Sequence, residues 1–269
     1  AIGKLEMTKE ELQKHFEEYK KFLIQNNLEV EFNKLIFLHK SNAMEEFKTL
    51  KNPKRPYFSN LINEIVRGDE KMIKNIVFDL GRVLLDYQPL VWLKKKNYTH
   101  YNELFEIIFQ NPLWIKLDEG TITREEFIEK LINEYPELAL DIEEIMEEWI
   151  ELLHPIENNI KLLSLLKEKG YSLYIISNFH LDAYNRFLKK QDWFTLFDGA
   201  IISAKEKLIK PDLKIYELLL ERYHLNADEC LFIDDSLDNI NACKNVGMNG
   251  IHLPDHSKLE EELKKHHII

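Results

Sequence analysis

The sequence predicts an α/β fold, in which a Rossmann-like parallel sheet carries helices on both faces. Short apolar runs with β-branched content recur along the later part of the 269-residue chain, and stretches of helical period separate them. Strands that alternate with helices demand a parallel sheet with right-handed crossovers. Such a sheet binds its ligand at the carboxyl ends of its strands, so we expect the functional residues there.

The expected strands are the apolar runs at residues 76–78, 172–176, 199–202, 231–233 and 250–253. The helices expected between them span residues 160–169, 181–190, 216–223 and 239–246. Gly170 and Gly247 follow the first and the last of these helices, as glycine commonly does at a helix end. Residues 72–89 and 160–269 are therefore interpreted as the sheet-bearing core.

Residues 90–159 are interpreted as an all-helical insertion into this core. Apolar residues recur there at helical spacing without strand-like alternation, and Thr123 with Glu126 forms a capping box. Its aromatic residues Trp92, Trp114 and Trp149 are more typical of a hydrophobic core than of a binding site. Residues 1–71 are interpreted as a separate helical segment, to which we assign no family and whose origin we leave open.

Four polar signatures stand at or near the ends of the expected strands. They are Asp79, Ser177, Lys210 before a proline, and the pair Asp234-Asp235. A nucleophilic carboxylate, a hydroxyl, a lysine and an acidic pair together make a phosphoryl-transfer site. Each signature alone is also typical of a turn or helix cap, and it is their joint order that favours catalysis.

This order and spacing resemble the haloacid dehalogenase (HAD) superfamily of phosphohydrolases, over roughly residues 72 to 255. The resemblance implies a helical cap inserted after the first motif, a magnesium ion and an aspartyl-phosphate intermediate. It implies that Asp79 is the nucleophile, and that Ser177 and Lys210 hold the transferring phosphoryl group. Asn178 and Arg82 are further candidates for contact with the substrate.

The same resemblance assigns the Mg²⁺ ligands to Asp79, the backbone carbonyl of Gly81 and Asp235, with Asp234 supporting the metal. The chemistry agrees, because magnesium prefers oxygen ligands and usually takes one or two carboxylates together with substrate oxygens. A hard cation is also needed because the attacking carboxylate and the phosphate repel each other.

Gly81 is a departure from the family pattern. Most phosphatases of the superfamily carry there a second aspartate, which protonates the leaving group. A subgroup similar to bacterial α-glucose-1-phosphate phosphatases also has glycine and remains active. Either another residue is then the acid, with Asp86 and Asp182 as candidates, or the leaving group needs little help.

Charge and cysteine content fit an intracellular enzyme. The chain has 36 Lys and Arg against 47 Asp and Glu, a formal charge of −11, which argues against nucleic acid or anionic membrane as the main partner. The two cysteines, Cys230 and Cys243, are expected to be buried or semi-buried free thiols. No apolar stretch reaches membrane-spanning length and the N-terminus shows no signal-peptide core, so we expect a cytoplasmic location.

The sequence therefore predicts a magnesium-dependent phosphatase that hydrolyses a small phosphorylated metabolite, such as a sugar phosphate. A haloacid dehalogenase-type hydrolase and a phosphosugar mutase stay open as alternatives, because both use an aspartate nucleophile. A non-catalytic binding module on the same fold is an alternative of another class. The substrate and the oligomeric state are not readable from these residues.

Overall fold

The computed structural model describes residues 72–269. Contacts divide the chain after Met72, and the unit Ile73–Ile269 is described by itself. The helical segment predicted over residues 1–71 lies outside the described residues. The boundaries proposed for the core and the insertion stay predictions.

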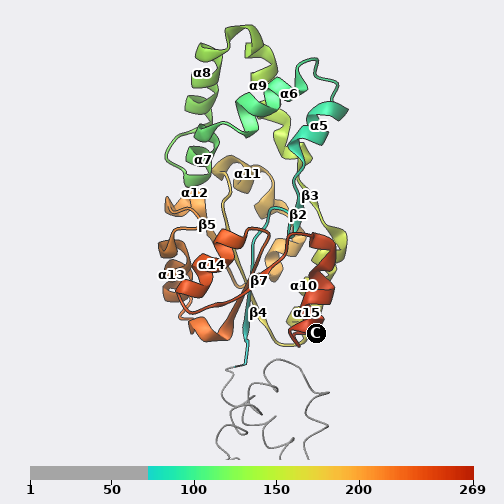
Figure 1. Ribbon diagram of the computed structural model, residues 1–269, viewed down its shortest axis with the longest axis vertical. Coiled ribbons are helices and arrows are strands. Elements are labelled where there is room, and N and C mark those ends of the chain that lie inside the picture. Colours follow the sequence, from blue (N-terminus) through green and yellow to red (C-terminus); the bar gives the residue numbers. More distant parts are fainter. Residues whose placement is uncertain (1–71) are drawn as a thin grey trace, which may run out of the picture. The chain divides into compact units, whose positions relative to one another are not determined.

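Five parallel strands form the sheet, in the order β5-β4-β1-β6-β7 (Figure 1). They are β1 (Asn75–Phe78), β4 (Ser172–Ser177), β5 (Gly199–Ile202), β6 (Cys230–Asp234) and β7 (Asn249–His252). The predicted fold class is thus confirmed. Phe78 of the central strand pairs with Ile175 on one side and Ile233 on the other, so these three strands end close together.

Helices cover both faces of the sheet. Successive side chains of β1 point to opposite faces and are apolar, so both faces have hydrophobic surface to bury. Ile76 and Phe78 lie in one hydrophobic cluster with residues of α10 (Glu157–Glu168) and α15 (Leu259–Lys265). Val77 lies in a second cluster with residues of α13 (Leu213–Arg222) and α14 (Leu237–Asn245). The second cluster also contains Cys230 and Cys243, which are buried free thiols as predicted.

The core also contains shorter helices. Between β4 and β5 lie α11 (Leu181–Arg186) and the 3-10 turns Leu188–Lys190 and Asp192–Leu196. Later in the chain come the short helix α12 (Ser203–Glu206) and the 3-10 turns Ala227–Glu229 and His256–Lys258. The helix expected over 181–190 is therefore shorter than predicted. It ends at Arg186, because the next residue, Phe187, has a φ of −121° and a ψ of −69°, which are not helical.

The predicted helical cap follows the first core segment (Figure 1). It consists of α5 (Pro89–Lys95), α6 (Tyr101–Leu104), the π-helix Phe105–Phe109, α7 (Pro112–Glu119), α8 (Arg124–Glu134), the 3-10 turn Pro136–Leu138, α9 (Ala139–Glu148) and the 3-10 turn Trp149–Leu152. The capping box of Thr123 and Glu126 is present at the start of α8.

A two-stranded antiparallel ribbon at the base of the cap was not predicted. It pairs β2 (Leu85–Asp86) with β3 (His154–Pro155). Two residues are too few to show the alternation by which a strand is recognised in a sequence. The ribbon brings the two ends of the insertion together.

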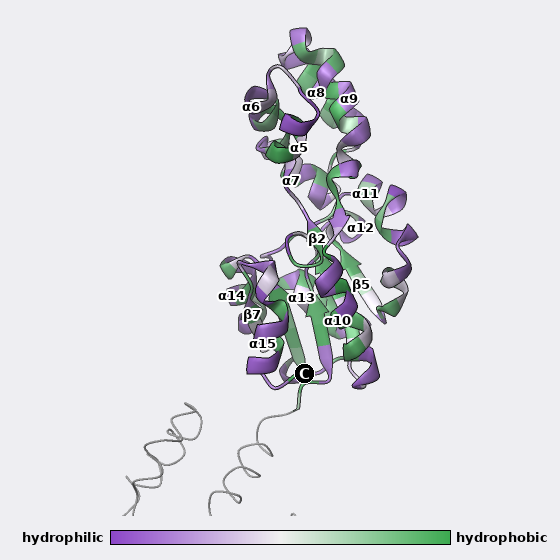
Figure 2. Ribbon diagram, turned by 90° about the vertical axis from the view of Figure 1, so that its right-hand side faces the viewer, coloured by the Kyte–Doolittle hydropathy of each residue, from purple (hydrophilic) through white to green (hydrophobic). Residues whose placement is uncertain are grey.

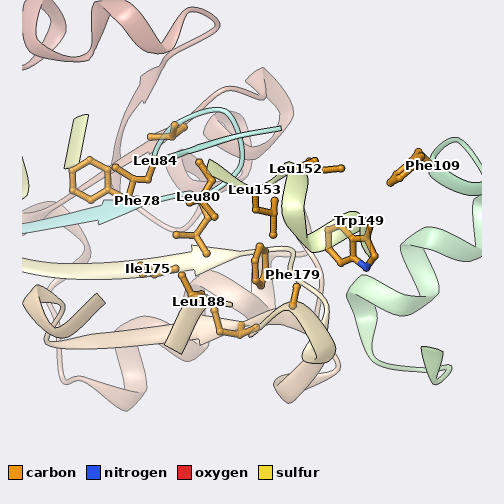
Figure 3. Packing of buried hydrophobic residues seen from close by; sticks show 14 of the residues in the cluster. Phe78, Leu80, Leu84, Phe109, Trp149, Leu152, Leu153, Ile175, Phe179 and Leu188 are labelled. Atoms are coloured by element: carbon orange, nitrogen blue, oxygen red, sulfur yellow. The ribbon is translucent and has the colours of Figure 1, made fainter. Parts of the chain in front are cut away.

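Cap and sheet share one continuous hydrophobic core. Figure 3 shows Leu80, Leu153 and Phe179 near the sheet, with Trp149 and Phe109 following on the cap side. In Figure 2 the strands are mostly hydrophobic and the outer faces of the helices mostly hydrophilic. No helix within residues 72–269 is long and apolar enough to cross a membrane.

The end of α7 approaches the core closely. Gly120 ends this helix with a φ of +70°, in the left-handed region that glycine enters without strain. A Cβ atom at this position would lie 2.3 Å from the carbonyl oxygen of Ala204 in α12. A residue with a side chain would therefore push this corner of the cap away from the core.

Candidate active site

Asp79 and Lys210 form a buried ion pair at the end of β1. The Lys210 Nζ lies 2.8 Å from Asp79 Oδ1 and 2.6 Å from Asp234 Oδ2. Asp79 is 8% exposed and Lys210 is 5% exposed. The ammonium therefore sits between two carboxylates that come from neighbouring strands, β1 and β6.

Ser177 and Asn178 come from the end of β4, on the other side of β1. The buried Ser177 hydroxyl donates a 2.8 Å hydrogen bond to Asp79 Oδ1. Asn178 is paired with the backbone of Lys210: its Oδ1 accepts from the Lys210 N–H at 2.9 Å, and its Nδ2 donates to the Lys210 carbonyl at 3.2 Å. Asn178 thus fixes the backbone that carries the lysine.

Asp79, Asp234 and Asp235 bring ligand oxygens within 4.8 Å of one another. Asp234 is fully buried and accepts hydrogen bonds from Asn239 Nδ2, from a backbone N–H and from Lys210. Asp235 is partly exposed, and Nη1 of Arg82 lies 3.7 Å from its Oδ2. Because the Asp234 oxygens already have several donors, Asp235 is the freer carboxylate of the predicted acidic pair.

This cluster carries more negative than positive charge. Burial raises the pKa of Asp79 to about 6, and the nearby Asp234 contributes to the rise, whereas Lys210 and Ser177 oppose it. Burial and Asp234 also raise the pKa of Asp235. Burial alone would lower the pKa of Lys210, but Asp79 and Asp234 outweigh it and raise that pKa.

A cavity of about 300 Å³ lies between these strand ends and the cap. Its apolar and aromatic lining residues are Leu85, Tyr87, Phe109, Trp114, Trp149, Leu153 and Phe179. Its polar lining residues are Asp79, Asp118, Ser177, Asn178, His180, Lys210 and Asn239, and Gly81 completes the lining. The volume suits a small organic molecule, and the predicted nucleophile faces it.

Other predicted candidates lie away from this cavity or on its edge. Arg82 is largely exposed, adopts a φ of +57° and faces Asp235. Asp86 accepts a hydrogen bond from Gln88, and Asp182 lies 3.2 Å from Arg186. Neither Asp86 nor Asp182 lines the cavity, so the structure does not support the two as acids for a leaving group there.

Trp114 and Trp149 are buried, as expected of core residues, and both also line the cavity. Sequence reasoning missed Asp118 and Tyr87 as cavity residues. The signal for Asp118 was faint: an acidic residue two positions before the glycine that ends the helix containing Trp114. Tyr87 follows the unpredicted strand β2, so no strand-end argument pointed to it.

Comparison with known proteins gives the family. A model of the haloacid dehalogenase-like hydrolases matches residues 76–253. The chain is 30% identical over 182 residues to sesquiterpene phosphatase astK of Aspergillus oryzae, covering 68% of this chain and 90% of that protein. It is 25% identical over 190 residues to D-ribitol-5-phosphate phosphatase of Bacteroides thetaiotaomicron, covering 65% and 89% respectively.

A solved structure shares the fold. It is the magnesium complex of a HAD-family enzyme from Bacteroides thetaiotaomicron, with a TM-score of 0.57 and 24% identity, covering 72% of this chain and all of that one. Together with the strand-end residues that the fold assembles, the family match over most of the described residues establishes the class of enzyme. The chain belongs to the haloacid dehalogenase-like hydrolases.

Proposed function

We propose that this hydrolase is a magnesium-dependent phosphatase, which cleaves a small phosphorylated metabolite through an aspartyl-phosphate intermediate. The observation that carries the proposal is the position of Asp79. Its carboxylate lines a small-molecule cavity, contacts both Ser177 and Lys210, and stands within 4.8 Å of the Asp234 and Asp235 carboxylates.

The residues present fit a magnesium ion. Asp79, Asp235 and the backbone carbonyl of Gly81 would hold it, and Asp234 would support them, so that all donors are oxygen atoms. The raised pKa values of Asp79 and Asp235 support this assignment, because they reflect buried negative charge that a cation would neutralise. When bound, magnesium would supply the charge that lets a carboxylate approach a phosphate.

The side chains of the site have separate tasks in the proposed reaction. A carboxylate oxygen of Asp79 attacks phosphorus, and the bond from phosphorus to the ester oxygen breaks. The Ser177 hydroxyl and the Lys210 ammonium, which now bind Asp79, would bind the phosphoryl oxygens as charge develops there. Water then hydrolyses the acyl phosphate and regenerates Asp79.

The organic part of the substrate would lie against the cap. The proposal covers a sugar phosphate, as predicted from the sequence, and one relative is named as a D-ribitol-5-phosphate phosphatase. The aromatic and aliphatic walls favour a second candidate, a phosphate ester of an apolar alcohol, and another relative is named as a sesquiterpene phosphatase. A cytoplasmic location stays a prediction.

Release of inorganic phosphate from a panel of sugar, prenyl and aryl phosphates tests the proposal. We expect turnover with Mg²⁺ and none after chelation. Chloride release from 2-chloropropionate without metal would instead identify a dehalogenase. Isomerisation of a sugar phosphate without phosphate release would identify a mutase. Inertness toward every compound would support a binding module.

A further inference from the structure

The site lacks a group to protonate the leaving oxygen at the position where the family usually has one. Residue 81 is glycine, and a Cβ atom placed on it would meet no heavy atom within 4 Å. No neighbouring side chain has moved into this space. If the leaving group is protonated, the proton must come from another wall of the cavity.

Five titratable side chains line the cavity within residues 72–269: Asp79, Tyr87, Asp118, His180 and Lys210. Asp79 is the proposed nucleophile. The Lys210 ammonium is bound to Asp79 and Asp234, which raise its pKa and so hold its proton. Burial and the charge of Asp118 raise the pKa of Tyr87 far above neutrality, so Tyr87 is a weak acid. Asp118 and His180 remain.

Asp118 and His180 come from opposite sides of the cavity. Asp118 lies on the cap helix α7, and His180 lies in the core segment between β4 and α11. His180 Nε2 stands 3.1 Å from Asp118 Oδ1, although it is not aligned with that oxygen as in a hydrogen bond. A carboxylate of the cap and an imidazole of the core therefore lie next to each other in the cavity wall.

The packing holds the imidazole in place. The His180 ring centroid lies 4.4 Å from that of Trp114 and 5.0 Å from that of Trp149. The residue is 5% exposed, so it has almost no contact with bulk water. The Asp118 backbone is fixed as well, because its carbonyl accepts a hydrogen bond from the buried Ser203 hydroxyl, which itself accepts from the Phe179 N–H.

We propose that His180, held by Asp118, is the acid that protonates the leaving group in place of the residue missing at Gly81. As the Asp79 oxygen bonds to phosphorus, the ester oxygen leaves with its electron pair and takes the imidazolium proton. The neutral imidazole then accepts a proton from the water that hydrolyses the acyl phosphate, which restores the imidazolium. The inference rests on the proposed phosphatase activity.

The surroundings of His180 suit both protonation states. The Asp118 carboxylate stabilises the imidazolium, while Trp114 and Trp149 contribute no charge. Asp79, Tyr87 and Lys210 are the other titratable groups on the cavity walls among the described residues. The proton for a poor leaving group is therefore expected from His180, whose imidazole lies in the cavity wall beside the Asp118 carboxylate.

His180→Gln tests the role, because glutamine keeps a polar side chain but cannot transfer a proton. We expect kcat/KM to fall only a few-fold for 4-nitrophenyl phosphate, whose leaving group needs no acid. For an alkyl phosphate we expect a fall of about 10²–10⁴-fold. His154→Gln, an exposed histidine in β3, is the matched control and should match the parent with both substrates.

Two further variants separate chemistry from packing. Asp118→Asn should lower kcat/KM with the alkyl phosphate more than with 4-nitrophenyl phosphate, because the imidazole loses the carboxylate beside it. Gly81→Asp combined with His180→Gln should restore much of the lost rate with the alkyl phosphate, since the introduced carboxylic acid would supply the proton. Equal losses with both substrates, or no loss at all, would overturn the role of His180. A parent protein inert toward every phosphomonoester would instead reject the phosphatase proposal itself.

Discussion

The Lys210 ammonium lies 2.8 Å from the Asp79 carboxylate, and both side chains are almost completely buried. The same ammonium contacts the fully buried Asp234. A buried charge without a partner costs several kcal/mol, whereas a paired one is tolerated. Lys210 is therefore needed for the folded state as well as for the proposed chemistry.

Lys210→Met should lower the free energy of unfolding by about 3–5 kcal/mol at pH 7, because two buried carboxylates lose their counter-charge. Urea unfolding measures this. The difference in unfolding free energy between parent and variant should shrink toward pH 5. The pKa of Asp79 is already raised, and loss of the lysine raises it further. Asp79 in the variant is therefore protonated at pH 5, which removes the unpaired charge. The exposed Lys161→Met serves as control and should stay within about 0.5 kcal/mol.

Asp79→Asn should abolish turnover and leave the fold intact, because the amide is nearly isosteric but cannot form an acyl phosphate. Phosphate release and circular dichroism measure the two effects. Asp86→Asn, outside the cavity lining, is the matched control and should keep the parent rate. A kcat above about a hundredth of the parent value would contradict Asp79 as the nucleophile.

Magnesium affinity should weaken as the pH falls through about 6, the pKa to which burial raises Asp79. Below that pH the metal must displace a proton, whereas above it the carboxylate is already ionised. We expect calorimetric titration to show a loss of about tenfold or more between pH 7 and pH 5. An affinity that is unchanged or higher at pH 5 would exclude Asp79 as a ligand of this pKa.

Gly120→Ala should loosen the cap at its contact with α12. The added Cβ would lie 2.3 Å from the Ala204 carbonyl oxygen, and alanine is disfavoured at a φ of +70°. Gly170→Ala separates the two effects, because Gly170 has a φ of +90° but no atom within 4 Å of the added Cβ. Urea unfolding should show the larger loss for Gly120→Ala, and equal losses would mean that the contact contributes nothing.

The strands and their terminal polar residues could be predicted because both are local in the sequence. A buried strand is apolar on both of its faces, as the run Ile76, Val77 and Phe78 is. The polar residue that follows such a run must then lie at the carboxyl end of the strand, where these sheets bind their ligands. The structure brings Asp79, Ser177 and Lys210 together, while their roles remain predictions.

The contact of Asp118 with His180 could not be predicted in the same way. It depends on how a cap helix packs on a core loop: Asp118 follows no predicted strand, and His180 lies in the loop beyond the strand-end residue Ser177. The backbone conformation of Arg82 could not be predicted either. Its φ of +57° is uncommon for an arginine, and nothing in the neighbouring sequence indicates it.

The central position of β1 has a consequence for biosynthesis. Asn75 in this strand pairs with Cys230 in β6, which is 155 residues further along the chain, and its other neighbour β4 follows the whole cap. At roughly 5–20 residues per second, a ribosome needs on the order of ten to thirty seconds to deliver β6 after β1. Throughout that interval β1 lacks a complete set of sheet neighbours and exposes apolar side chains. A nascent chain of this protein should therefore depend on chaperones until its last strands emerge.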